Sequence, residues 1–108
     1  MCTLVILRRP QHQWPLIIGA NRDELITRKW ESPARHWEDH PQIIAGIDKL
    51  AGGTWLGIND DGVLATVLNR IDSLGPVLNK RSRGELPLNA LDHANARSAA
   101  KSLSALDS

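Results

Sequence analysis

The chain has 108 residues, a formal net charge of +1, 42% hydrophobic residues and 23% charged residues. This composition is typical of one globular domain with a single core, and the small net charge gives no field that attracts nucleic acid or anionic membranes. No apolar run is long enough to span a bilayer, so we expect no nucleic-acid partner and no membrane insertion.

Two short apolar runs open the chain and predict a β-hairpin. Residues 2–7 are rich in β-branched side chains and predict a buried strand. Residues 16–20 form the second run, and the segment around Pro10 between them is typical of a turn. The first run ends at Arg8 and Arg9, too early for a signal peptide, which favours a cytoplasmic location.

The middle of the chain predicts a long connection and then more strands. Residues 22–42 are polar and predict no regular structure, and connections of this length often carry function. Residues 43–46 predict a third strand. Residues 54–58 and 63–68 predict a second hairpin, because the intervening Asn-Asp-Asp-Gly is typical of a tight turn.

Helix signals appear only in the C-terminal part. Residues 85–91 carry leucines at helical spacing, and Pro87 falls in the first turn, where a helix tolerates proline. Residues 93–108 form an alanine- and serine-rich tail that could be a further helix, and we separate this tail from the region 1–92. Strands followed by helices predict an α+β fold with a largely antiparallel sheet and a C-terminal helix.

Cys2 is the only cysteine, which excludes an intrachain disulfide and a cysteine-cage metal site. Two interpretations of its place remain open. It could be a small hydrophobe in a buried strand, as free cysteines commonly are. Alternatively, removal of Met1 would make Cys2 the N-terminal residue, with its thiolate as a nucleophile and its own α-amine as the base.

Polar residues follow the second predicted strand and are expected near Cys2, because the end of a hairpin's second strand lies beside the start of its first. Asp23 could hold an α-ammonium group, and Arg22 could stabilise a thiolate or bind an anionic group of a substrate. Asn21 could donate or accept a hydrogen bond. The alternative is a solvated turn with an internal Arg–Asp pair.

Asn69 directly follows the apolar run 63–68. Its amide could cap a turn, or it could donate a hydrogen bond to a developing oxyanion. Asn59 has a stronger explanation as a turn residue, because it begins the Asn-Asp-Asp-Gly sequence.

His36 and His40 are spaced four apart, as two ligands on one helix face would be. However, Pro33 and Pro41 bracket them, and the sequence offers no evident third ligand. We therefore expect no metal site and no cofactor.

Several motifs of the chain resemble the NRDE family, also called the transport and Golgi organisation family. These are MCTLVIL at the N-terminus, ANRDE, and GGTWLGI followed by LNR and RSRGEL. The resemblance implies a fold similar to part of the four-layer αββα arrangement of N-terminal nucleophile hydrolases. Family members are much longer, so the chain corresponds to the N-terminal part of that fold.

The segment GINDDGVLATVLN is also similar to a stretch of the choloylglycine hydrolase and penicillin acylase group. In that group a processed cysteine is nucleophile and base, an aspartate holds the amine and an asparagine helps form the oxyanion hole. The resemblance implies Cys2, Asp23 and Asn69 as catalytic residues and points to a small-molecule, non-peptide amide as substrate. Asn21 and Arg22 would then bind the substrate.

Three functional interpretations remain open. The first is an N-terminal cysteine hydrolase of amide bonds. The second is a non-catalytic binding or trafficking protein, linked to the secretory pathway or to haem as eukaryotic family members are. The third is an inactive truncated remnant. A homo-oligomer, or a missing C-terminal half, would be needed to cover the sheet face that so short a chain exposes.

Overall fold

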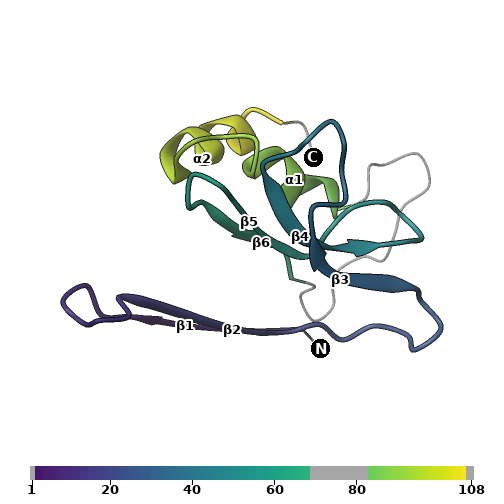
Figure 1. Cartoon of the computed structure of the whole chain (residues 1–108), viewed down its shortest axis with the longest axis horizontal. Coiled ribbons are helices and arrows are strands. Elements are labelled where there is room, and N and C mark those ends of the chain that lie inside the picture. The colour runs from purple at the N-terminus through teal and green to yellow at the C-terminus, as the bar shows by residue number, and fades with distance from the viewer. Residues whose placement is uncertain (1, 69–82, 107–108) are drawn as a thin grey trace.

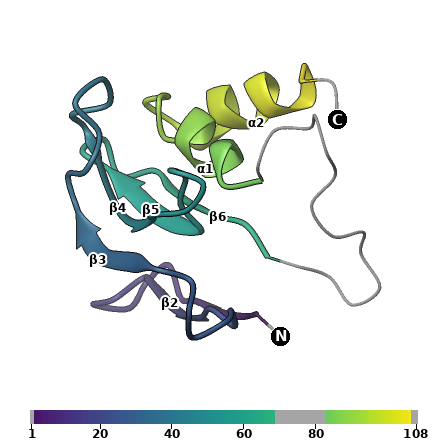
Figure 2. The same ribbon diagram turned by 90° about the vertical axis from the view of Figure 1, so that its right-hand side faces the viewer.

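The computed structural model describes residues 2–68 and 83–106, which form two antiparallel sheets and two helices (Figure 1). The elements are, in chain order, β1 (Thr3–Arg8), β2 (Leu16–Asn21), β3 (Trp30–Ala34), β4 (Ile43–Asp48), β5 (Leu56–Asn59), β6 (Leu64–Thr66), α1 (Glu85–Ala90) and α2 (Ala96–Ser104). The helices lie on one side of the four-stranded sheet and the β1–β2 hairpin lies on the other, as Figures 1 and 2 show. The predicted α+β class is confirmed.

The β1–β2 hairpin is confirmed, with Thr3 paired to Asn21 at its base and Arg8 to Leu16 near its tip. The prediction that its first strand is buried is wrong. Val5 is 61% exposed and Ile6 is 60% exposed, because in the part of the chain that the structure describes no other helix or strand packs extensively against the hairpin. Neighbouring strand residues point to opposite faces, so both faces of the hairpin are apolar.

The second sheet has the order β3-β4-β5-β6 and contains the predicted second hairpin, β5–β6. The prediction of a connection without regular structure over residues 22–42 is wrong, because β3 lies within it. β3 pairs with β4 from Trp30 opposite Asp48, and its register shifts between Glu31 and Ala34. It is an edge strand with a proline at position 33, which such a strand tolerates. The sequence of β3, WESPA, does not alternate apolar and polar residues, and for this reason it did not predict a strand.

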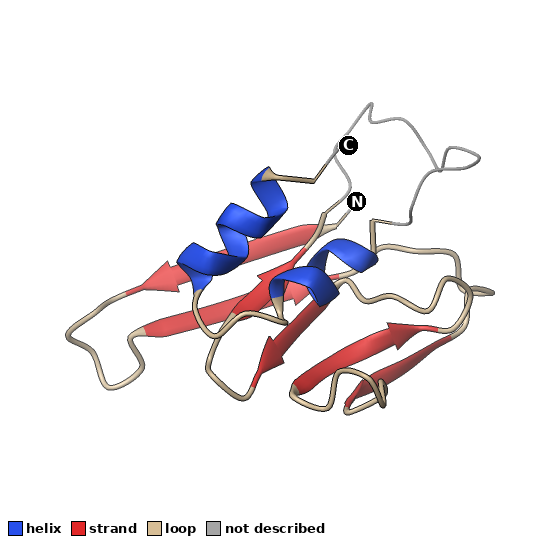
Figure 3. Ribbon diagram, turned by 90° about the horizontal axis from the view of Figure 1, so that it is seen from above, coloured by secondary structure: helices blue, strands red, loops and turns tan. Residues whose placement is uncertain are grey.

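The core lies between the four-stranded sheet and the helices, which Figure 3 shows from above. Its buried members are Ile43, Ala45, Val63 and Leu91, with Trp37, Ala65 and Leu88 packed against them. Gly57 lies between Ala45 and Ala65 in the sheet, and a Cβ there would come within 3.0 Å of Leu91 Cδ1. The absent side chain therefore lets the end of α1 approach the sheet. Both predicted helices are confirmed.

Asn59 joins the β5–β6 turn to the helix layer. Only 3% of this residue is exposed. Its Oδ1 accepts hydrogen bonds from the backbone N–H groups of Asp61 at 3.0 Å and Val63 at 2.9 Å. Its Nδ2 donates to the carbonyl oxygens of Leu91 at 3.0 Å and His93 at 2.7 Å. The amide is thus fully used, and the interpretation of Asn59 as a turn residue is confirmed.

Gly53, in the motif GGTWLGI, and Gly84, in the motif RSRGEL, lie against each other. The N–H of Thr54 donates to the carbonyl of Gly84 at 3.1 Å. A Cβ at Gly53 would lie 2.6 Å from the carbonyl carbon of Gly84. Because backbone rather than a flexible side chain occupies that space, residue 53 has to be glycine for this approach.

We expect Asn59→Ala to lower the free energy of unfolding by about 2–4 kcal/mol, because each buried backbone group that loses its partner costs about 1–3 kcal/mol. Asn95→Ala is the matched control. The Oδ1 of Asn95 accepts one exposed hydrogen bond from Ser98 at the start of α2, so this variant should cost about 1 kcal/mol. Urea unfolding of both variants measures the difference, and equal losses would contradict the role assigned to Asn59.

Gly53→Ala should lower the free energy of unfolding by about 1–3 kcal/mol, because the added methyl group forces the two backbone segments apart. Gly19→Ala in β2 is its control, since a Cβ at Gly19 meets nothing within 4 Å. The urea midpoint of Gly19→Ala should stay close to that of the unchanged protein. A midpoint for Gly53→Ala that is equally unchanged would show that the Gly84 segment moves aside freely.

Candidate functional site

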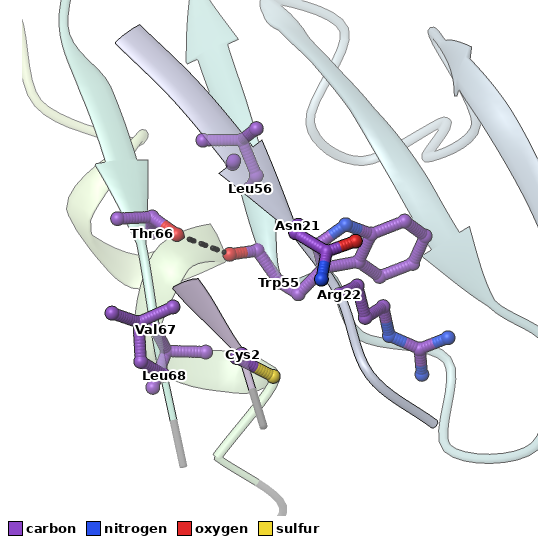
Figure 4. Close-up of a pocket in the computed structure, with 9 residues that line it drawn as sticks. Cys2, Asn21, Arg22, Trp55, Leu56, Thr66, Val67 and Leu68 are labelled. Atoms are coloured by element: carbon purple, nitrogen blue, oxygen red, sulfur yellow. Dashed lines mark hydrogen bonds between the residues drawn. The ribbon is translucent and has the colours of Figure 1, made fainter. Parts of the chain in front are cut away.

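Cys2 lines a small pocket between the base of the β1–β2 hairpin and the ends of β5 and β6 (Figure 4). The pocket encloses about 50 Å³ and is lined by Cys2, Ala20, Asn21, Arg22, Trp55, Leu56, Thr66, Val67 and Leu68. The pairing of Thr3 with Asn21 explains why the hairpin brings Cys2 and the polar residues after β2 together. A pocket of this size holds a water or a small functional group rather than a whole substrate.

The thiol of Cys2 is half-buried rather than enclosed in a core. Its Sγ lies 4.0 Å from the backbone carbonyl oxygen of Asp23, so it is the main chain of Asp23 that it meets here. In Figure 4 the sulfur lies between Leu68 and Arg22. The expected proximity of Cys2 to residues 21–23 is therefore observed.

Arg22 is held by one aromatic ring and two carboxylates. Its guanidinium lies 4.3 Å from the centre of the Trp55 ring. Its Nη2 is 3.7 Å from Asp48 Oδ2 and 3.9 Å from Glu24 Oε2. The structure thus favours the interpretation of Arg22 as an arginine that is paired with acidic residues. The two carboxylates belong to Asp48, at the end of β4, and to Glu24.

Asp48 is the acceptor on which this group of charges converges. Arg28 donates to Asp48 Oδ2 from Nη2 at 2.5 Å and from Nε at 3.0 Å, and the N–H of Leu50 donates to Oδ1. Burial alone would raise the pKa of Asp48, but the hydrogen bonds from Arg28 and the backbone outweigh it, so the pKa lies below that of an ordinary aspartate. The same hydrogen bond raises the pKa of Arg28.

The opposite wall of the pocket is mainly apolar and is set by Trp55. The carbonyl oxygen of Trp55 accepts hydrogen bonds from Thr66 Oγ1 at 2.8 Å and from the N–H of Val67 at 3.0 Å. The Trp55 ring packs edge-on against Trp30 and covers Gly46, where a Cβ would lie 2.6 Å from the ring. These contacts fix the side of the pocket that faces Cys2.

Asn69, the predicted oxyanion donor, lies outside the described residues. It follows Leu68, which lines the pocket. Sequence reasoning missed Asp48, Arg28 and Trp55. An acidic residue closing the apolar run of β4 was a usable signal for Asp48, whereas nothing local to Arg28 indicated its partner 20 residues away.

The two histidines at metal-like spacing belong to no helix and are engaged separately. His36 Nε2 lies 2.7 Å from the carbonyl oxygen of Ser32, and His40 Nδ1 lies 2.7 Å from Asp92 Oδ1. Among residues 2–68 and 83–106, no group of three histidine, cysteine, aspartate or glutamate side chains could hold a metal ion. Within the same residues, neither helix is long and apolar enough to cross a membrane.

Comparisons with known proteins identify relatives of the chain. The family model described as Transport and Golgi organisation 2 matches residues 1–107. An uncharacterized protein of Saccharomyces cerevisiae is 38% identical over 96 residues, which are 81% of this chain and 30% of that protein. The Transport and Golgi organization protein 2 homolog of Homo sapiens is 38% identical over 81 residues, which are 70% of this chain and 28% of that protein.

The Bos taurus homolog is likewise 38% identical, over 80 residues that are 68% of this chain and 26% of that protein. The chain thus spans less than a third of the length of these curated relatives. No solved structure matches the chain.

The position of Asp48 predicts how stability depends on pH. A carboxyl whose pKa is lower in the folded state stabilises the fold at neutral pH, and this contribution disappears as the pH falls below about 4. We expect Asp48→Asn to lower the free energy of unfolding at neutral pH and to weaken its further loss in acid. The raised pKa of Arg28 adds nothing in this range, since arginine stays protonated in both states.

Urea unfolding at a series of pH values checks this expectation. Asp60→Asn is the control, because Asp60 forms a similar two-pronged pair with Arg35 but lies at the surface. Solvent screens such a pair, so its removal should change the acid dependence less. If Asp48→Asn and the unchanged protein lose stability in parallel down to acid pH, the role assigned to Asp48 is wrong.

Proposed function

The chain belongs to the Transport and Golgi organisation 2 family, and on this premise we propose that it is an N-terminal cysteine hydrolase that cleaves a non-peptide amide bond of a small molecule. One observation carries the proposal: the only thiol of the chain is half-buried in a pocket and lies beside Asn21 and Arg22. A thiol that is partly exposed among polar groups is in the setting that a reactive cysteine needs.

The mechanism begins with removal of Met1, which leaves Cys2 with a free α-amine. The amine takes the proton of the thiol, and the thiolate attacks the carbonyl carbon of the amide. The resulting oxyanion would be stabilised by Asn69 and a backbone N–H group. The α-ammonium group, held by Asp23, gives its proton to the departing amine. Water then hydrolyses the acyl-cysteine, which releases the acid and regenerates the thiol.

The pocket supports a small, neutral group at the reacting carbonyl. Leu56, Val67 and Leu68 line the wall opposite the hairpin, and the charge of Arg22 is already matched by two carboxylates. Asn21 is among the residues that line the pocket and would orient the substrate through its amide. A reducing compartment such as the cytoplasm would keep Cys2 in the thiol form.

A second candidate is a non-catalytic binding role, and the exposed apolar side chains of the β1–β2 hairpin favour it. Apolar faces of this kind are found at protein interaction sites. This role predicts an unactivated thiol and a function that survives Cys2→Ser. It is therefore decided by the same measurement as the first candidate.

The test is the rate of alkylation of Cys2 against pH, read by intact mass on protein with its native N-terminus. Because Cys2 is the only cysteine, the mass shift reports on one thiol, and the same spectrum shows whether Met1 is present. We expect Met1 to be absent and the midpoint of the rate profile to lie below about 8.5, the pKa of a model cysteine. Cys2→Ser gives the background.

A panel of small-molecule amides completes the test. We expect hydrolysis of at least one of them, with Cys2→Ser retaining less than about a thousandth of the rate. Retention of Met1, or a midpoint at or above that of a model cysteine, would refute the hydrolase and favour the binding role.

A further inference from the structure

We propose that Arg22 is a positioning residue: it fastens the base of the β1–β2 hairpin to the four-stranded sheet and thereby holds Cys2 in the pocket. Its guanidinium lies 4.3 Å from the Trp55 ring centre and 3.7 Å from Asp48. Trp55 precedes β5 and Asp48 ends β4, whereas Arg22 directly follows β2. One side chain thus connects the hairpin to two neighbouring segments of the other sheet.

The carboxylates around Arg22 are themselves fixed. Asp48 is 8% exposed and receives two hydrogen bonds from Arg28. Glu24 Oε2 lies 3.6 Å from Arg28 Nη1 and 3.9 Å from Arg22 Nη2. We call these four residues, Arg22, Glu24, Arg28 and Asp48, the Arg22 cluster. Its two positive and two negative charges balance, which leaves Arg22 without the excess charge that would attract an anionic substrate.

Arginine is suited to this position in a way that lysine is not. A planar guanidinium can stack on an aromatic face and face carboxylates at its edge simultaneously. The side chain of Arg22 is 17% exposed and that of Asp48 is 11% exposed, so water screens the attraction less than at an open surface. The contact therefore helps to hold the segment that follows β2 against the other sheet.

The hairpin depends on such a contact because it has little other support. Its strands are well paired with each other, but Val5, Ile6 and Leu16 are more than half exposed. Across the residues that the structure describes, no strand or helix outside the hairpin packs extensively on it. Support is concentrated at the base, where Asn21, Arg22 and Cys2 meet Trp55 and its neighbours in the pocket.

The experiment measures two features of Cys2 alkylation in the full chain. The rate at the alkaline plateau, where the thiol is fully ionised, reports access to Cys2. The pH midpoint reports activation of the thiol. We expect Arg22→Met to raise the plateau rate about tenfold, because the variant loses both the cation–π contact with Trp55 and the ion pair with Asp48 that oppose local opening.

Three further variants sharpen the test. Arg22→Lys keeps the charge but not the planar stack, so its plateau rate should lie between those of the unchanged protein and Arg22→Met. Glu24→Gln is a milder change to the Arg22 cluster that keeps the fold if Arg22→Met unfolds, and it too should raise the plateau rate. Arg35→Met is the matched control: it removes an exposed two-pronged Arg–Asp pair outside the pocket and should leave the alkylation profile unchanged.

The outcomes distinguish failure of this positioning role from failure of the proposed hydrolase function, on which the role of Arg22 in catalysis rests. If the unchanged protein has an ordinary midpoint but Arg22→Met and Glu24→Gln both raise the plateau rate, the hydrolase is wrong and the positioning role stands. If the plateau rates of folded Arg22→Met and Glu24→Gln equal that of the unchanged protein, Arg22 does not hold the hairpin and the proposal is overturned. A loss confined to binding of anionic substrates, with an unchanged alkylation profile, would restore Arg22 to substrate binding.

Discussion

The buried amide of Asn59 is the interaction from which the arrangement of the site follows. It closes the β5–β6 turn from one side and receives the end of α1 on the other. The turn fixes how β5 pairs with β6, and that register places Leu56 opposite Thr66. Both residues line the pocket, together with residues adjacent to them in the chain. The position of the wall opposite Cys2 therefore depends on the turn at the other end of β5 and β6.

Local signals predicted the hairpins and helices, because each depends on residues close in sequence. Each signal indicated an element that contains it or lies next to it in the chain. This holds for the apolar run at 16–20, for the Asn-Asp-Asp-Gly turn and for Pro87 in the first turn of α1. β3 was missed because its sequence, WESPA, does not alternate apolar and polar residues and contains a proline. The burial of β1 was mispredicted for a different reason. An apolar run predicts that other residues pack against the strand, but no extensive packing of this kind is found among the described residues.

The candidate site shows the same division between local and distant information. A hairpin brings Cys2 to Asn21 by pairing alone, so their proximity could be predicted from two apolar runs. The partners of Arg22 could not, because Asp48 and Trp55 lie in another sheet and meet it only through tertiary packing. The tetrapeptide Asn-Arg-Asp-Glu suggested an internal Arg–Asp pair. Of Glu24 and Asp48, the one closer to Arg22 is Asp48, the last residue of β4, so the arginine of the motif connects the two sheets.

The Arg22 cluster also implies an order of assembly during translation, because its members lie far apart in the sequence and are synthesised at different times. The β1–β2 hairpin contains only local contacts and can form soon after residue 21 is made. Its supports at Asp48 and Trp55 come later in the chain. During translation the hairpin can therefore form before the sheet on which its base rests. Formation of the hairpin and assembly of the pocket are in this way separate events, and the thiol of Cys2 enters its final surroundings only after Asp48 and Trp55 have been made.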